Sequence, residues 1–119
     1  MGFVQVRVGL EKISDSSFRR EIELLADTGA LYSMVPAKIL RELGIEPRER
    51  MTFTLADGRT IDRDVGDARF HYERRNAVSS VIFGENDDAA ILGLVTLEEL
   101  GLEVDPVGKR LRPGRLILY

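Results

Sequence analysis

The chain has 119 residues, with no cysteine, one histidine, and 17 basic against 20 acidic residues for a net charge of −3. This length fits one domain, residues 1–119, with its own hydrophobic core, and the lack of cysteine excludes disulfides and thiolate metal sites. The mild charge argues against a dedicated nucleic-acid binder, and no apolar run reaches the roughly 20 residues that span a bilayer. We therefore expect a cytoplasmic domain that binds neither nucleic acid nor membrane.

Alternating apolar and polar residues dominate the chain and predict short, half-buried β-strands. The period-two stretches lie at residues 4–8, 18–24, 51–55, 68–72, 78–83 and 115–119. Turn-forming residues separate them, and Asp57-Gly58 is a strong hairpin signal between two such stretches. The pattern predicts a mainly β protein, and a small closed β-barrel with one or two short helices would bury these strands.

Two short helices are expected to interrupt the strands. Apolar residues at 36, 39, 40 and 43 fall on one helical face. Pro36 suits the first turn of this helix, and Gly44 suits the position just past its end. For a second helix at residues 97–100, Thr96 would cap the start, Glu99 would complete a capping box, and Gly101 would end it.

Several kinds of chemistry lack the residues that they need. A zinc site or a Ser-His-Asp triad would have to rely on His71, and no glycine-rich phosphate loop is present. We therefore expect no metal and no cofactor. His71 alternates outward on its strand and is interpreted as an exposed side chain, and Asp87-Asp88 is interpreted as a solvated loop.

The segment with the most chemical information is Leu25-Ala26-Asp27-Thr28-Gly29-Ala30, followed by Ser33 and Val35-Pro36. By itself, Asp-Thr-Gly is also an ordinary turn sequence. A second segment, Ala90-Ile91-Leu92-Gly93-Leu94, follows at a separation of 91 − 27 = 64 residues. Together these segments resemble the retroviral-type (retropepsin-like) aspartic proteases, and the resemblance extends from the first strand to about Asp105-Pro106.

The resemblance implies a role for each residue of the two segments. Asp27 would be the catalytic carboxylate, Thr28 would hydrogen-bond across a two-fold axis, and Gly29 would let two backbones approach closely. Ala30 would begin the wall of the substrate cleft. Ile91, Leu92 and Gly93 would form a supporting strand beneath the Asp27 loop.

The chain holds a single Asp-Thr-Gly sequence, so a pair of catalytic carboxylates requires a homodimer. Two close carboxylates share one proton, and together they can activate a water against a peptide carbonyl. By the same resemblance, the hairpin at residues 51–65 is the expected flap over an extended peptide or protein substrate. Its tip would comprise Leu55, Ala56, Asp57 and Gly58.

Two other functions remain open at this point. The chain could be a non-catalytic peptide-binding or dimerisation module on the same fold. It could also be an unrelated small β-barrel interaction domain, in which Asp27-Thr28-Gly29 is a simple turn and Ile91-Leu92-Gly93 an ordinary core strand. A symmetric dimer in which the two Asp27 side chains touch would exclude this last alternative.

Overall fold

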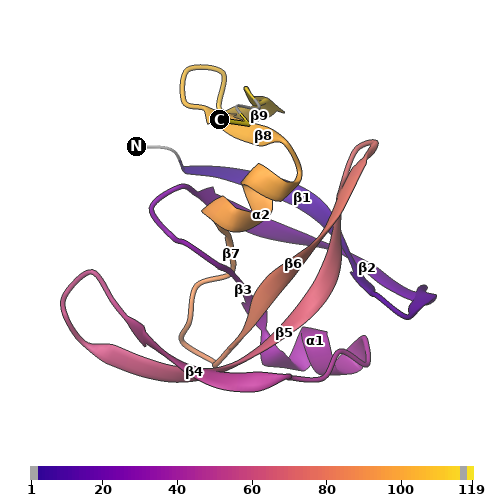
Figure 1. Ribbon diagram of the computed structural model, residues 1–119, viewed down its shortest axis with the longest axis vertical. Helices are drawn as coiled ribbons and strands as arrows, with labels where there is room; N and C mark the ends of the chain where they lie inside the picture. Colours follow the sequence, from indigo (N-terminus) through magenta and orange to yellow (C-terminus); the bar gives the residue numbers. More distant parts are fainter. Residues whose placement is uncertain (1–2, 116–117) are drawn as a thin grey trace.

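The computed structural model describes residues 3–115 and 118–119, and β-strands make up most of it (Figure 1). The strands are β1 (Phe3–Lys12), β2 (Asp15–Asp27), β3 (Ser33–Pro36), β4 (Glu49–Thr54), β5 (Thr60–Tyr72), β6 (Arg75–Gly84), β7 (Ile91–Leu92), β8 (Leu102–Asp105) and β9 (Arg110–Pro113). The helices are α1 (Ala37–Glu42) and α2 (Leu94–Glu99). The predicted mainly β class with short helices is confirmed.

Seven of the strands form one sheet in the order β1-β2-β7-β3-β6-β5-β4, and β1 makes a second pairing with β5. Strands β8 and β9 form a separate two-stranded sheet. Strand β7 runs parallel to β2, and β3 runs parallel to β6. The short β7, from late in the chain, therefore separates β2 and β3, which are neighbours in sequence.

The alternation in the first two strands sets their register. Val6 pairs with Leu24 and Val8 pairs with Ile22, and all four side chains are buried. Glu23, between the two buried residues of β2, is exposed. A slip of one residue would turn every one of these apolar side chains toward water, so the pattern specifies one pairing.

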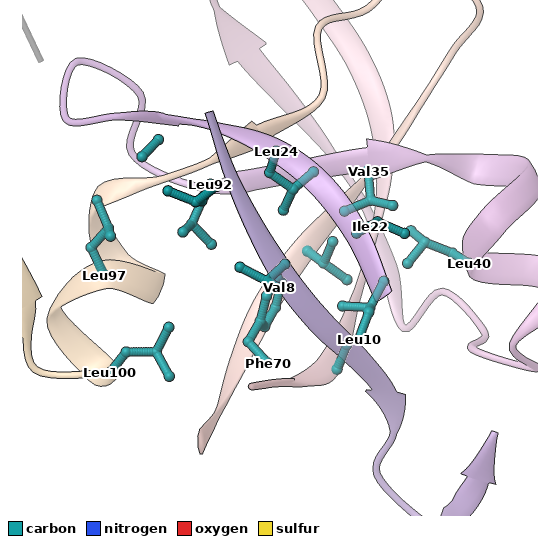
Figure 2. Close-up of a cluster of buried hydrophobic side chains, with 14 of the residues drawn as sticks. Val8, Leu10, Ile22, Leu24, Val35, Leu40, Phe70, Leu92, Leu97 and Leu100 are labelled. Carbon is teal, nitrogen blue, oxygen red and sulfur yellow. The ribbon is translucent and has the colours of Figure 1, made fainter. Parts of the chain in front are cut away.

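The hydrophobic core joins the sheet to both helices (Figure 2). Phe70 of β5 is fully buried at its centre, beside side chains from β1 and β2. Leu92 of β7 and Leu97 of α2 point into the same cluster and are 0% and 1% exposed. Burying such a side chain contributes about 1.5–3 kcal/mol. The segment around β7 is therefore anchored in the core.

Helix α1 forms where the sequence predicts it. Pro36 is the residue before its first turn, and Leu43 ends it. Gly44 follows with φ +76°, and its N–H donates to the carbonyl of Arg41 at 2.9 Å. This left-handed position favours glycine, which explains why the helix ends here.

Helix α2 starts earlier than the sequence predicts, and the predicted Thr96 capping box is wrong. The residue before the helix is Gly93, and Thr96 lies inside the helix with a fully buried side chain. The N–H groups of Leu94 and Val95 donate to carbonyls of the β2–β3 loop at 2.8 and 3.0 Å. These bonds satisfy the first turn, so no side-chain cap is needed. The predicted end holds, because Gly101 has φ +69°.

Two further expectations need correction. The predicted strand at residues 115–119 lies partly outside the described residues, and the described Arg115, Leu118 and Tyr119 belong to no strand. His71 is not exposed: its Nε2 lies 2.9 Å from Glu11 Oε1, and its side chain is 17% exposed. The cause is the β1–β5 pairing, which places Gly9 of β1 opposite His71 and covers this side of β5.

Candidate functional site

Asp27 is the last residue of β2 and begins a tight turn. Its Oδ1 accepts a hydrogen bond of 2.8 Å from the N–H of Gly29, and its carbonyl accepts one of 3.2 Å from the N–H of Ala30. Turns in which an aspartate accepts from the backbone two residues on are locally stable. The carboxylate is therefore oriented by its own turn, which leaves it partly exposed beside the exposed Thr28 and Gly29.

The structure brings the two predicted segments together. Leu25 pairs with Ile91 and Ala26 pairs with Leu92 in parallel register, and the N–H of Leu25 donates to the carbonyl of Ala90 at 3.0 Å. Ile91 also pairs with Met34 of β3 on its other side. Strand β7 thus holds both the strand that enters the Asp27 turn and the strand that leaves it.

Gly93 lies against the backbone of the Asp27 loop. A Cβ atom at this position would lie 2.4 Å from the carbonyl carbon of Tyr32 and 2.8 Å from the nitrogen of Ser33. Its φ of −88° is accessible to any residue, so glycine is required here for space. The next two N–H groups bind the carbonyls of Ala30 and Leu31. The loop is therefore bonded to the start of α2 along its length.

Behind the loop lies a buried cluster of hydroxyl groups that no local sequence pattern predicts. Ser33 Oγ lies 2.6 Å from Thr96 Oγ1, which lies 2.8 Å from Ser79 Oγ. Ser33 Oγ also accepts a 2.9 Å hydrogen bond from the N–H of Gly93. The three side chains are at most 5% exposed. They join β3, β6 and α2 behind the Asp27 turn.

The predicted hairpin forms from β4 and β5, with Thr54 opposite Thr60. At its tip, Leu55 N–H donates to the carbonyl of Arg59 at 2.7 Å, and Gly58 has φ +89°. Ala56, Asp57 and Gly58 are exposed, and hydrogen bonds from the backbone and side chain of Arg59 lower the pKa of Asp57. Figure 1 shows this tip and the β2–β3 loop projecting on the same side of the molecule.

The prediction that Asp87-Asp88 is a solvated loop holds for Asp87 but is wrong for Asp88, which is mostly buried in an ion pair. Arg63 of β5 donates to both oxygens of Asp88, from Nε at 2.7 Å and from Nη2 at 3.1 Å. The two side chains are 14% and 16% exposed, whereas Asp87 is exposed. The hydrogen bond from Arg63 lowers the pKa of Asp88. This ion pair ties the loop before β7 to the strand that forms the hairpin.

The comparisons with known proteins bear on the fold. No protein-family model and no curated protein matches the chain. Among solved structures, the solution structure of the Simian Foamy Virus (mac) protease is similar, with a TM-score of 0.55 and 17% sequence identity. The match covers 79% of this chain and 91% of that chain. The chain has the fold of a retroviral protease.

Within this retroviral protease fold, a broad hollow lies apart from the Asp27 turn. It has a volume of about 1110 Å³ and lies between α1, β5 and the loop before β7. Three basic side chains, Lys38, Arg41 and Arg63, line it together with four acidic ones, Glu42, Glu85, Asp87 and Asp88, so the two kinds of charge nearly balance. Asp27 is not part of its lining.

Among residues 3–115 and 118–119, no group of three histidine or acidic side chains is arranged to hold a metal ion. Over the same residues, no helix is long and apolar enough to cross a membrane.

Proposed function

We propose that the chain is an aspartic endopeptidase that acts as a homodimer, with the Asp27 carboxylates of two copies at a shared site. The observation that carries the proposal is the Asp27 turn, which is bonded to β7 and α2 within a retroviral protease fold. One chain supplies one such turn, so a pair of carboxylates needs a second copy related by a two-fold axis.

The proposed chemistry uses the two carboxylates as acid and base. Because like charges at a separation of a few ångströms repel, the pair holds one proton. The ionised Asp27 takes a proton from a water as that water attacks the peptide carbonyl, and the protonated Asp27 donates to the carbonyl oxygen. In this arrangement Thr28 would bond across the two-fold axis, and Gly29 would allow the two turns to meet.

The β4–β5 hairpin is the proposed flap. It would close over an extended peptide, pair with its backbone as an added strand, and exclude water from the scissile bond. Phe53 of the hairpin contacts Tyr32 of the loop that follows Asp27, and both side chains are partly buried. These aromatic rings beside the proposed site support a preference for hydrophobic side chains on either side of the cleaved bond.

The closed barrel expected from the sequence is part of the same proposal. The second pairing of β1, with Leu10 opposite Phe70 of β5, supports a sheet that closes on itself. Closure would leave β4, at the end of the strand order, as the edge strand of the flap.

The proposal is tested by incubating the protein with a mixed peptide library from acid to neutral pH, with Asp27→Asn as the matched control. Asparagine preserves the size of the side chain but cannot act as a carboxylate base. Cleavage by the wild type alone would establish the activity and its side-chain preference. Equal cleavage by both proteins would contradict it. Peptide binding without cleavage would instead favour a non-catalytic peptide-binding or dimerisation module on the same fold.

A further inference from the structure

We infer that Ser33, Thr96 and Ser79 are positioning residues, whose hydroxyl network fixes where the Asp27 turn stands. The inference rests on the proposed function for its effect on catalysis. The network itself is a property of the fold and can be measured separately. None of the three side chains is a catalytic residue, because each lies buried behind the turn.

The network connects four segments of the protein. Ser33 is the first residue of β3, where the loop from Asp27 ends. Its hydroxyl accepts from the N–H of Gly93 at 2.9 Å and contacts Thr96 of α2 at 2.6 Å. Thr96 then contacts Ser79 of β6 at 2.8 Å. The position of β3 is thus tied to β6, to α2 and to the backbone at the end of β7.

The network holds the loop at the end opposite the β2–β7 pairing. At the start of the loop, Ala26 is paired with Leu92. In the middle, the carbonyls of Ala30 and Leu31 bind the first N–H groups of α2. At the end, Ser33 binds Gly93. Since Thr96 lies in α2, its hydroxyl fixes both the helix and the chain that returns from Asp27.

Hydroxyl groups buried in a protein core must satisfy a condition that apolar side chains do not. Buried polar groups are unfavourable unless each finds a partner, whereas apolar side chains would fill the same space without that condition. A fully satisfied network, however, permits one arrangement and resists sliding. Thr96 holds the middle place, where a methyl group could neither donate to nor accept from the two serines.

Loosening the network is expected to lower the rate of the reaction. A catalytic pair built from two copies doubles any error in the placement of one turn, and a misplacement of about 1 Å can reduce a rate about 100-fold. The three hydroxyls bond to one another and to the N–H of Gly93, so the hairpin that would pair with a peptide keeps its own strand pairing when a hydroxyl is removed. Loosening the network should therefore lower kcat and leave KM nearly unchanged.

The test compares Thr96→Val, which keeps the shape and removes the hydroxyl, with Thr96→Ser, which keeps the hydroxyl. We expect Thr96→Val to lower kcat at least about tenfold with KM within about twofold, and Thr96→Ser to restore most of kcat. The acidic and basic limbs of the pH–rate profile should also move toward each other in Thr96→Val, because two carboxylates held farther apart repel less.

Two further variants separate positioning from loss of stability. Val8→Ala removes buried volume from β1, outside the network, and serves as the control for loss of stability. The kinetics of each variant are measured at the same number of degrees below the melting temperature of that variant. Ser79→Ala removes the outermost hydroxyl and is used if Thr96→Val does not fold. If Thr96→Val and Ser79→Ala match Val8→Ala in kcat and in pH profile, the inference is overturned.

Amide hydrogen exchange gives a readout that does not depend on activity. In Thr96→Val the amides of Ala30, Gly93, Leu94 and Val95 should exchange faster than in Val8→Ala, while the rest of the sheet does not. If these four amides exchange at the same rates in Thr96→Val and in Val8→Ala, the inference is overturned. If the wild type cleaves no peptide, the proposed function fails. The exchange rates of these four amides then test by themselves whether the network holds the turn.

Discussion

Tyr32 and Phe53 meet edge to face, with their ring centroids 5.9 Å apart and their planes at 81°. Tyr32 belongs to the loop that follows Asp27, and Phe53 belongs to β4 of the hairpin. Such a contact contributes about 0.5–1.5 kcal/mol beyond the burial of area. The hairpin is therefore attached to the loop that carries the candidate catalytic residue.

Phe53→Ala should weaken the attachment of the hairpin and lower kcat/KM. The loss of about 0.5–1.5 kcal/mol corresponds to a decrease of roughly twofold to tenfold. Thr54→Ala, at the exposed neighbouring position on β4, is the matched control and should change little. Steady-state kinetics on one peptide would check this, and equal values for the two variants would count against a role for the aromatic pair.

Gly93→Ala should destabilise the fold severely. The added Cβ would lie 2.4 Å from the carbonyl carbon of Tyr32, so the loop would have to move away from α2. We expect a loss of about 3 kcal/mol or more in the free energy of unfolding, at the upper end for overpacking.

Gly58→Ala provides the contrast to Gly93→Ala. Nothing lies within 4 Å of a Cβ at Gly58, and its φ of +89° is the source of strain there. A non-glycine residue in this region costs about 1–2 kcal/mol. Urea unfolding of both variants would check the order, and a larger loss at Gly58 would contradict the close approach seen at Gly93.

The ion pair between Arg63 and Asp88 should make stability depend on pH. The hydrogen bond from Arg63 lowers the pKa of Asp88 in the folded protein below the ordinary value of 3.8. Because the folded protein favours the ionised form, this contribution is present above the unfolded pKa and is lost as pH falls through the folded pKa. Asp88→Asn should therefore remove about 1–3 kcal/mol at pH near 7.

Urea unfolding at neutral pH and near pH 3 measures this effect. The difference between wild type and Asp88→Asn should shrink at the lower pH, because the unfolded wild-type chain takes up a proton at Asp88 more readily than the folded protein does. Asp87→Asn, at the exposed neighbouring residue, should show no such dependence. A difference that stays constant between the two pH values would exclude the ionised pair as its source.

A shared site predicts that an inactive variant interferes with the wild type. Added Asp27→Asn should form mixed dimers that carry one aspartate, so activity per wild-type chain should fall as the variant is added. Dilution of the wild type below the dissociation constant of the dimer should lower its specific activity for the same reason. Unchanged activity in both measurements would show that one chain is sufficient.

The sequence predicts local features of the fold well. Alternation locates β1, β2, β4, β5 and β6 but misses the short β3, β7, β8 and β9. Asp57-Gly58 locates the hairpin, and Gly44 and Gly101 locate the helix ends. These features depend on neighbouring residues, whose patterns the sequence displays directly. The pairing of the Asp27 and Ile91 segments is long-range, and only the family resemblance predicts it.

The hydroxyl network could not be predicted in this way. Its contacts join residues 63 and 17 positions apart, and no local pattern marks a serine that faces a threonine across the core. The Thr96-x-x-Glu99 spacing imitates a capping box and predicts the wrong role. The exposure of His71 is predicted wrongly for a related reason, because alternation along β5 carries no information about its second partner strand, β1.

The late position of β7 in the chain has a consequence for synthesis. During synthesis, Asp27 emerges from the ribosome long before Ile91 and Thr96. Until these later residues emerge, the Asp27 turn lacks its parallel strand β7 and the N–H groups of α2 that bind its loop. A nascent chain thus carries the aspartate without the framework that orients it, and domains of this size fold as units. A chain still attached to the ribosome would therefore be inactive as the proposed hydrolase and would not cleave other nascent chains on the same polysome.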